Sequence, residues 1–475
     1  MSESTSEPQS PSEPKSASEP KKLIVNLFEM NTPGHITHGM WRQPGNNREH
    51  YKDMRYWLEL ARIAESGGFD SIFIADVIGA YDVYKNSLEP ALREGMQIPN
   101  NDPLLVIPAM AAVTEHIGFG VTFSTSYEPP FAFARRMSTL DHLTAGRIGW
   151  NIVTSYLPNA ARNFGLEDQI PHDTRYEIAD EYMDVVYKLW EGSWDDGAVL
   201  VDRENGVYTD PSKVRPINHV GRHFKVAGPH LSEPSPQRTP LLFQASASKA
   251  GVAFASKHAE VLFTADRPPG ALGSNIATIR DEAINLGRRA HDLRFLVMAT
   301  VITGRTDEEV AEKLARYRRF TSAEGKFIHM SIPFSPLDHP AEITVREALE
   351  REGRFDLIEA GGLPLHLTVG QLSVSVDESW DERQFFVAGT PDVVADEIER
   401  WLDEVGVDGI NLRQYHSFET AKDFAELVAP ELRRRGRMRQ AYVEGETLRE
   451  RIFGDGPLLP ERHYAARFRG GRNLD

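Results

Sequence analysis

The stretch FGVTFSTSYEPPFAFARRMSTLDHLTAGRIGWNIVTS, residues 119–155, decides the fold. Both of its ends are rich in the aromatic, β-branched and other apolar residues that favour strands. Between them, residues 130–146 have the apolar spacing of a helix and finish at a glycine. The stretch therefore predicts two strands, at 119–126 and 147–155, joined by a helix. The second strand ends in Asn151, Thr154 and Ser155, which are small polar residues at the end of an apolar run.

The same alternation of strand and helix continues along the chain. Strands are predicted at 21–28, 69–76, 119–126, 147–155, 240–246, 259–265, 294–302 and 408–414, and helices at 56–68, 104–118, 130–146, 175–192, 273–289, 307–322 and 391–405. Continuous apolar strands of this kind are buried on both faces. Eight strand–helix units predict an α/β fold, a closed (β/α)8 TIM barrel. An open doubly wound sheet is the alternative, but its usual Gly-rich turn after the first strand is missing from the sequence.

Two stretches interrupt this alternation. Residues 193–239 and 323–386 are expected as long insertions, which commonly serve as lids, mobile loops or oligomer contacts. Residues 1–20 are rich in Ser, Pro and Glu and predict a disordered N-terminal tail. The barrel with its insertions is then expected over residues 21–455, followed by a C-terminal tail at 456–475.

Composition excludes several classes of function. The 475 residues include no cysteine, so disulfides, thiolate catalysis and cysteine-bound metals are excluded, and a cytoplasmic location fits. The net charge of −17 argues against nucleic acid as the main partner. No apolar run approaches the ~20 residues of a membrane span, and the N-terminus lacks the apolar segment of a signal peptide. The sequence thus favours a small-molecule substrate, with no role for nucleic acid or membrane.

Polar residues recur where the predicted strands end, which is where barrels of this type carry their active sites. These strand-end residues are Asp76, Thr122, Ser124, Asn151, Ser246 and Ser248, and the segment after the first strand adds His35, His38 and Trp41. Turn and helix capping is the alternative interpretation of Asn151 and Thr154. His35 and His38 form the one H-x-x-H pair, without a nearby acid, so no metal site is predicted. A neutral polar lining favours a cofactor that carries its own chemistry.

Several runs carry a resemblance to a known family. Beside residues 124–155 they are THGMWR (37–42), AARNFG (160–165), HDTRYEIADEY (172–182), QASAS (244–248) and FVAGTPDVVADEI (386–398). With these, residues 22–453 resemble the bacterial luciferase-like flavin monooxygenases. The chain is most similar to the branch that contains nitrilotriacetate monooxygenase and dibenzothiophene sulfone monooxygenase.

The resemblance implies a barrel that binds reduced FMN, which a separate NAD(P)H:flavin reductase supplies by diffusion or by contact. It implies a two-component enzyme in which reduced FMN and O₂ form a flavin peroxide that transfers one oxygen atom to a small substrate. The expected FMN contacts are Asp76, Thr122, Asn151, His172, Tyr176, Ser246 and Ser248. His38 and Trp41 are candidate catalytic groups on the substrate side, with packing of their loop as the equal alternative. A homodimer or homotetramer is implied as well.

The motif HDTRYEIADEY also predicts where the phosphate of FMN binds. If a helix begins near Asp173, His172 and Tyr176 lie at its N-terminus, which favours an anion. Arg175 is the nearest cation, with a surface ion pair as the alternative interpretation.

The substrate is predicted more loosely. A polycarboxylate needs several cations, and the predicted strand ends offer mainly Arg42 and Arg413. An aromatic or heteroaromatic xenobiotic, either a sulfone or a halogenated compound, is therefore favoured. The alternatives are an aminopolycarboxylate monooxygenase of the same branch, an F420-dependent oxidoreductase and a non-catalytic flavin-binding barrel.

Overall fold

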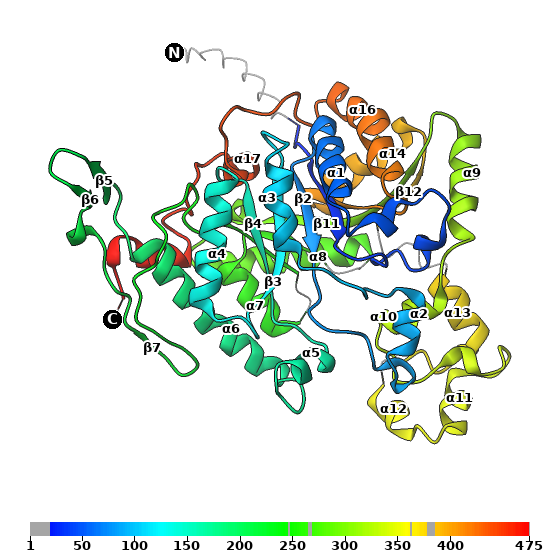
Figure 1. Ribbon diagram of the computed structural model, residues 1–475. Helices are drawn as coiled ribbons and strands as arrows, with labels where there is room; N and C mark the ends of the chain where they lie inside the picture. The colour runs from blue at the N-terminus through cyan, green and yellow to red at the C-terminus, as the bar shows by residue number, and fades with distance from the viewer. Residues whose placement is uncertain (1–19, 246–247, 265–267, 362, 378–384, 475) are drawn as a thin grey trace, which may run out of the picture.

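The structure of the chain is a computed structural model that describes residues 20–245, 248–264, 268–361, 363–377 and 385–474. Eight parallel strands form its centre (Figure 1). They are β1 (Ile24–Met30), β2 (Ser71–Ala75), β3 (Gly118–Ser124), β4 (Ile148–Val153), β9 (Leu241–Ala245), β10 (Val261–Phe263), β11 (Arg294–Thr303) and β13 (Gly409–Arg413). The sheet closes because β11 pairs with both β10 and β13, and β13 pairs with β1. The predicted (β/α)8 barrel is confirmed.

Aromatic side chains fill the interior of the barrel. The rings of Phe243 and Phe263 stack with centroids 5.6 Å apart, and Phe73 packs against both. Two glycines make room for them: a Cβ atom at Gly149 would lie 2.4 Å from the ring of Phe243, and one at Gly120 would lie 2.8 Å from Phe73. The barrel is therefore closed by packing below its mouth, and the cavity that the polar strand ends share lies near the carboxyl ends of the strands.

Helices cover the outside of the barrel. They are α1 (Met54–Gly67), α3 (Ile107–Ala111), α4 (Pro130–Leu143), α6 (His172–Tyr187), α7 (Lys249–His258), α8 (Pro269–Asn285), α9 (Asp307–Arg318), α14 (Pro391–Arg400) and α16 (Ala429–Arg434). The helix predicted at 104–118 is shorter than expected, since a 3₁₀ turn at Pro103–Val106 precedes α3. Pro108 explains the division, because proline fits the first turn of a helix but not its interior.

A ninth parallel strand, β12 (Phe385–Gly389), was missing from the prediction. It pairs with residues Ala299–Thr303 of β11, beyond the part of β11 that belongs to the barrel. At ten residues β11 is longer than its neighbours, so its outer half is free to take this extra partner. The segment before β12 is the second predicted insertion, which therefore returns to the barrel alongside β11.

Both insertions form structure outside the barrel. The first carries a two-stranded arm, β5 (Val199–Asp202) with β6 (Val207–Thr209), and a shorter hairpin, β7 (His219–Val220) with β8 (Lys225–Val226). The second forms α10 (Ala323–His329), α11 (Val345–Arg351), α12 (Phe355–Ala360) and α13 (Val369–Asp377), which lie beside α2 (Glu89–Glu94) in Figure 1. Phe327, Ile332 and Leu349 of this small unit share a hydrophobic core with Tyr81, Met96 and Leu157 from the connections after β2 and β4, and this core is separate from that of the barrel.

The two ends of the chain differ. The predicted N-terminal tail lies outside the described residues, apart from Pro20. Residues 456–474, predicted as a tail, pack on the barrel in the structure and bury Leu459, Ala465 and Phe468. Before them, α17 (Leu448–Phe453) covers the amino-terminal end of the barrel with Leu448 and Ile452. Within the described residues, no helix combines the length and the apolar character that crossing a membrane requires.

Candidate functional site

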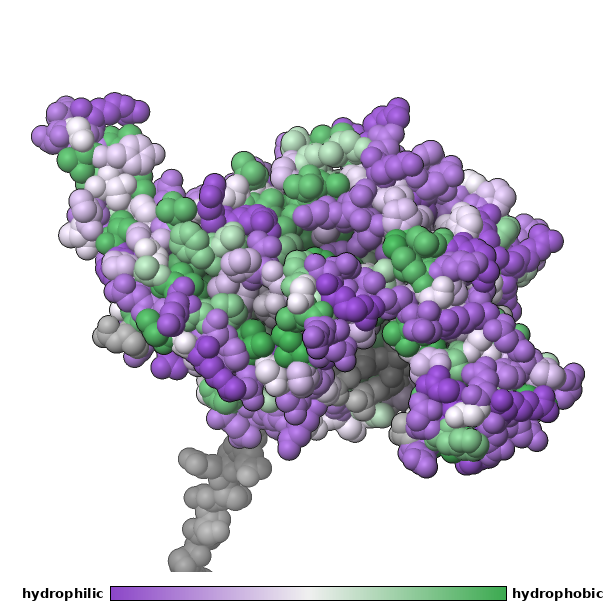
Figure 2. Space-filling view, turned by 60° about the horizontal axis from the view of Figure 1, so that its bottom comes forward, coloured by the Kyte–Doolittle hydropathy of each residue, from purple (hydrophilic) through white to green (hydrophobic). Residues whose placement is uncertain are grey.

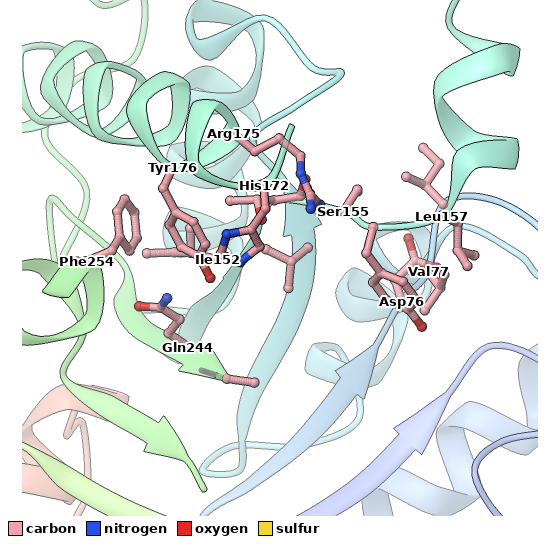
Figure 3. A pocket seen from close by; sticks show the side chains of 15 residues that line it. Asp76, Val77, Ile152, Ser155, Leu157, His172, Arg175, Tyr176, Gln244 and Phe254 are labelled. Atoms are coloured by element: carbon pink, nitrogen blue, oxygen red, sulfur yellow. The ribbon is translucent and has the colours of Figure 1, made fainter. Parts of the chain in front are cut away.

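A cavity of about 310 Å³ lies at the carboxyl ends of the strands. Its lining includes Asp76 after β2, Ile152 and Ser155 at the end of β4, and Gln244 at the end of β9. Figure 3 shows His172, Arg175 and Tyr176 entering this cavity from one helix, with Asp76 on the other side. A smaller cavity beside it is lined by Asp76 and Ser155 as well, together with Thr122 and Ser124 of β3. The polar strand ends predicted from the sequence therefore do meet at one place.

The N-terminus of α6 forms one wall of the larger cavity. The helix begins at His172 after Pro171, and no side chain caps its first N–H groups. His172 and Tyr176 are one turn apart, and their rings lie with centroids 5.2 Å apart. Free N–H groups and the positive end of a sixteen-residue helix favour an anion at this point.

Arg175, in the first turn of α6, strengthens this preference for an anion. Its side chain is buried, and its Nε has no hydrogen-bond partner among the described residues. One Nη group lies 3.5 Å from the carbonyl oxygen of Thr154, and burial lowers the pKa of the guanidinium. A buried cation with an unused donor is costly unless a ligand completes its contacts. Arg175 thus belongs to the cavity and not to a surface ion pair.

The serines of the QASAS motif have different positions. Ser248 is the N-cap of α7, where its hydroxyl accepts a hydrogen bond from the N–H of Gly251 at 3.1 Å. Ser246 lies outside the described residues. Gln244 lines the cavity, and its Oε1 is buried without a partner among the described residues. The amide of Gln244 is thus a further polar group available to a ligand.

Asp76 lies between the two cavities. Asn100 donates a hydrogen bond to its Oδ1 at 2.7 Å, while burial raises the pKa of the carboxyl group to about 6. At neutral pH the group is a carboxylate that has lost part of its hydration, and it is therefore a strong acceptor for a ligand N–H or O–H.

The raised pKa predicts how Asp76 affects stability. A carboxyl group whose folded-state pKa lies above its unfolded value destabilises the fold as the pH rises through the interval between them, here from about 4 to about 6. We expect Asp76→Asn to raise the free energy of unfolding of the flavin-free protein at pH 8 by about 3 kcal/mol, with no gain below pH 4. Urea denaturation at pH 4, 6 and 8 measures this, and an equal gain at all three values would contradict it.

Thr122 and Asn151 occupy neighbouring strands in register. The Asn151 amide donates to the Thr122 hydroxyl at 2.9 Å, so the pair is preorganised. The Oδ1 of Asn151 is buried and has no partner among the described residues. Beside them, the hydroxyls of Ser155 and Ser124 lie 2.8 Å apart. Hydroxyl and amide groups thus line this side together with the carboxyl groups of Asp76 and Glu128, whereas the sequence indicated a single acid.

His38 faces a residue that the sequence did not single out. Its Nε2 lies 3.1 Å from Nδ1 of His329, which belongs to α10 of the second insertion. Burial lowers the pKa of His38 well below its usual value and that of His329 to about 4, so both rings are neutral at pH 7. The ring of Tyr81 packs against His329, and its hydroxyl bonds to the hydroxyl of Tyr156. Tyr156 also lines the larger cavity, so contacts through Tyr156, Tyr81 and His329 connect this cavity with the second insertion.

Trp41 and Arg42 serve the packing of their own loop. The indole N–H of Trp41 donates to the carbonyl oxygen of Glu94 at 2.8 Å, and the side chain is 39% exposed. Arg42 donates to the carbonyl oxygens of Phe320 and Thr321. The structure thus places His38 near the site and Trp41 against α2. A role of Trp41 in substrate binding stays a prediction.

The loop that carries these residues is anchored by a buried polar network. Arg48 forms an ion pair with Glu29 of β1, and both side chains are almost fully buried. The hydroxyl of Tyr56 and the amide of Gln414 donate to the same carboxylate, at 2.6 and 2.9 Å. Burial raises the pKa of Glu29, and the charge of Arg48 and the hydrogen bond from Tyr56 oppose that rise.

Sequence reasoning missed several of these groups. His329, Tyr81 and Gln97, whose amide oxygen accepts from Tyr81 at 3.2 Å, lie in no motif and meet only in the fold. Ser155 was recognisable as a strand end, and its φ of 54° turns the chain sharply there. His35 is buried against the ring of Phe28, and among the described residues no group of three or more His, Asp or Glu side chains is placed to hold a metal ion.

Comparison with known proteins identifies the family. The profile of the luciferase-like monooxygenases matches residues 34–409. The chain belongs to this luciferase-like monooxygenase family. It is 48% identical to the long-chain alkane monooxygenase of Geobacillus thermodenitrificans and 42% identical to the dimethyl-sulfide monooxygenase of Hyphomicrobium sulfonivorans. Each alignment covers 94% of this chain, and they cover 98% and 94% of the two relatives.

Solved structures agree with the family assignment. A crystal structure of long-chain alkane monooxygenase superimposes with a TM-score of 0.87, at 47% identity over 94% of this chain and all of the other. Riboflavin lyase, solved with modified FMN and riboflavin, has a TM-score of 0.83 at 34% identity, over 95% of this chain and all of the other. This luciferase-like monooxygenase is accordingly a flavin-dependent enzyme of a (β/α)8 barrel family.

The residues of this luciferase-like monooxygenase fit a flavin nucleotide. The N-terminus of α6 with Arg175 suits the phosphate, and Asp76 with the free oxygens of Asn151 and Gln244 suits the polar groups of the ribityl chain and the ring. Ile152 and Phe254 supply apolar walls for a flat ring system. The cavity therefore offers a charged end and an apolar, hydrogen-bonding remainder, as FMN requires.

Proposed function

We propose that the protein is the oxygenase component of a two-component system, and that it uses reduced FMN and O₂ to insert one oxygen atom into a small, uncharged, apolar substrate. The observation that carries the FMN assignment is the buried guanidinium of Arg175 at the uncapped N-terminus of α6. The terminal phosphate of FMN can accept hydrogen bonds from the guanidinium and from the free N–H groups of the helix, whereas riboflavin has no phosphate. When bound, reduced FMN supplies the electrons that reduce one oxygen atom of O₂ to water while the other enters the substrate.

The protein's own residues bind and orient the reactants. His172, Arg175 and Tyr176 hold the phosphate end, and Asp76, Thr122 and Asn151 fix the other end by hydrogen bonds. His38, neutral at pH 7, can donate or accept a proton on the substrate side, where Trp41 stays a second candidate. The small unit formed by 323–377 lies over this side through the contact of His329 with His38 and limits the access of water.

The substrate class follows from the charges and from the rim. Arg175 is the one lysine or arginine among the described residues that line the two cavities, and we assign it to phosphate. Ile78, Tyr156, Phe164 and Leu166 stay 38–51% exposed, and they belong to the cavities or to the segment between β4 and α6. The one further cation of that segment, Arg162, is paired with Asp82. An apolar rim of this kind suits an uncharged apolar compound. The alkane and dialkyl sulfide in the names of the two relatives are such compounds, and the aromatic substrate favoured by the sequence belongs to the same class.

A separate flavin reductase is the proposed partner. A relative at 34% identity is named as component A of nitrilotriacetate monooxygenase, which indicates a multi-component enzyme. The sequence also lacks a G-x-G-x-x-G turn for binding NADH itself. The reductase can deliver reduced FMN by diffusion or by contact.

The experiment that tests this function combines the purified protein with FMN, NADH and an unrelated flavin reductase under ¹⁸O₂. The panel contains a long-chain alkane, a dialkyl sulfide, an aromatic sulfone and nitrilotriacetate. We expect oxygen uptake coupled to a product that gains one ¹⁸O atom from an uncharged member of the panel. Turnover of nitrilotriacetate alone would overturn the substrate class, and turnover with reduced F420 in place of FMN would overturn the cofactor.

We also infer a homodimer or homotetramer that uses the β5–β6 arm. Figure 2 shows this arm extending from the body with apolar residues along it, of which Leu200 is 49% and Tyr208 65% exposed. An isolated two-stranded hairpin is marginal in water and gains stability when it is covered. We expect light scattering to give a multiple of the chain's mass and Leu200→Ser with Tyr208→Ser to lower that multiple. A monomeric wild-type protein would contradict the inference.

A further inference from the structure

Helices α6 and α7 both contribute side chains to the same cavity. His172, Arg175 and Tyr176 of α6 and Phe254 of α7 all line it. The rings of Tyr176 and Phe254 pack with centroids 5.7 Å apart and form the first contact between the two helices. The position of the N-terminus of α6 relative to α7 therefore depends on the other contacts between these two helices.

The next turn supplies that contact. Asp180 follows Tyr176 by four residues, and His258 follows Phe254 by four, so the same two faces meet again. Oδ1 of Asp180 lies 2.7 Å from Nε2 of His258, and both of its oxygens accept from the ammonium group of Lys257, at 2.7 and 2.8 Å. His258 is fully buried, while Asp180 keeps partial access to solvent. One carboxylate of α6 thus binds two consecutive side chains of α7.

The C-terminal segment supports this junction from behind. Nε2 of His463 lies 3.0 Å from the carbonyl oxygen of His258, and the hydroxyl of Tyr464 donates to Asp184 of α6 at 2.9 Å. The ammonium group of Lys257 lies 4.0 Å from the centre of the Tyr464 ring. Both partners of Asp180 are therefore held in place by a third segment. The hydroxyl of Tyr187 of α6 lies 3.2 Å from Nδ1 of His258 as a further link between the two helices, and Asp180 is the link nearer to the N-terminus of α6.

We propose that Asp180 is a positioning residue for the phosphate of FMN, because it holds the first turns of α6, which carry His172 and Arg175, against α7. This inference rests on the proposed function. Charge-assisted hydrogen bonds to phosphate weaken when donors shift by a fraction of an ångström. Asp180 is remote from Asp76, Thr122 and Asn151, which belong to other strands and loops. Its loss therefore reduces recognition of the phosphate and leaves recognition of the ring unchanged.

The test compares FMN with riboflavin, which lacks the phosphate. Both are titrated into the purified flavin-free protein, and binding is followed by flavin fluorescence. For Asp180→Ala we expect the affinity for FMN to fall about tenfold and that for riboflavin to stay unchanged. Asp180→Asn, which retains one acceptor oxygen, and Lys257→Met, which retains the contact of Asp180 with His258, are expected to have smaller effects in the same direction.

Glu181→Ala is the matched control. Glu181 is adjacent on α6, but its carboxylate accepts the N–H groups of His223 and Phe224 in the short hairpin, away from α7. The preference of the Glu181→Ala variant for FMN over riboflavin is expected to equal that of the wild type. A parallel loss of both flavins in Asp180→Ala, or an unchanged preference, would overturn the proposal while the FMN site stands. A wild type that binds riboflavin as tightly as FMN would overturn the phosphate site itself, and the positioning role with it.

Discussion

Arg175→Met is expected to weaken the binding of FMN about 30- to 100-fold and to leave the binding of riboflavin unchanged. A hydrogen bond between charged partners contributes about 1.5–3 kcal/mol, and Arg175 offers its buried, unpartnered Nε together with an Nη group. Since the flavin-free protein holds this cation with few partners, its removal is expected to leave the free energy of unfolding unchanged or slightly higher. Fluorescence titration and urea denaturation measure the two effects separately.

Two further variants sharpen the experiment on Arg175. Arg175→Lys is expected to recover part of the affinity, because lysine restores the charge without the planar donors. Arg222→Met is the control, since Arg222 pairs with Glu177 on the exposed side of the same helix. Equal losses of FMN and riboflavin affinity in Arg175→Met would show that the residue supports the cavity and not the phosphate.

Glu29→Ala is expected to lower the free energy of unfolding by about 3–5 kcal/mol, which is the largest effect on stability that we predict. The change leaves the guanidinium of Arg48 buried without its carboxylate, and it removes the acceptor of Tyr56 and Gln414. The loop that carries His35 and His38 begins at the end of β1 and passes through Arg48, so its anchor is lost at the same time.

A double-variant cycle tests this explanation. Glu29→Leu with Arg48→Leu is expected to cost less than Glu29→Ala alone, because it leaves no buried charge without a partner. Urea denaturation of the single and double variants gives the coupling energy. Single effects that simply add in the double variant would contradict a direct pairing. Removal of the exposed Arg222–Glu177 pair is the control and is expected to change stability little.

The barrel was predictable because its strands are buried on both faces, whereas each of its helices is buried on one side and exposed to solvent on the other. Each of the eight strands appears in the sequence as a short apolar run, and that signal is local. β12 escaped detection because it lies outside the eight-strand alternation and pairs with the outer half of β11, at the end of a stretch that was taken as an insertion. The C-terminal segment was taken for a tail because its few apolar residues, such as Leu459 and Phe468, are scattered among charges.

The site was predictable where it is made of strand ends. Asp76, Thr122 and Asn151 meet because parallel strands bring their carboxyl ends together. The same argument cannot find His329, which comes from an insertion and reaches His38 across almost three hundred residues. Nor can the argument from strand ends show that the side chain of Arg175 is buried. That burial depends on the packing of α6 against the loop at Thr154.

The separate core of the unit at 323–377 has a consequence for the evolution of this enzyme. The chain leaves the barrel after α9 and returns at β12, and both of these elements contact β11. The core of this unit, which includes Phe327 and Leu349, also takes in Tyr81 and Leu157 from the connections after β2 and β4, but it is separate from the core of the barrel, so changes confined to the unit leave the barrel's packing intact. Yet it contributes His329 beside His38. Exchange of this one module between relatives can therefore alter which molecules enter, while the apparatus that holds the flavin is inherited unchanged.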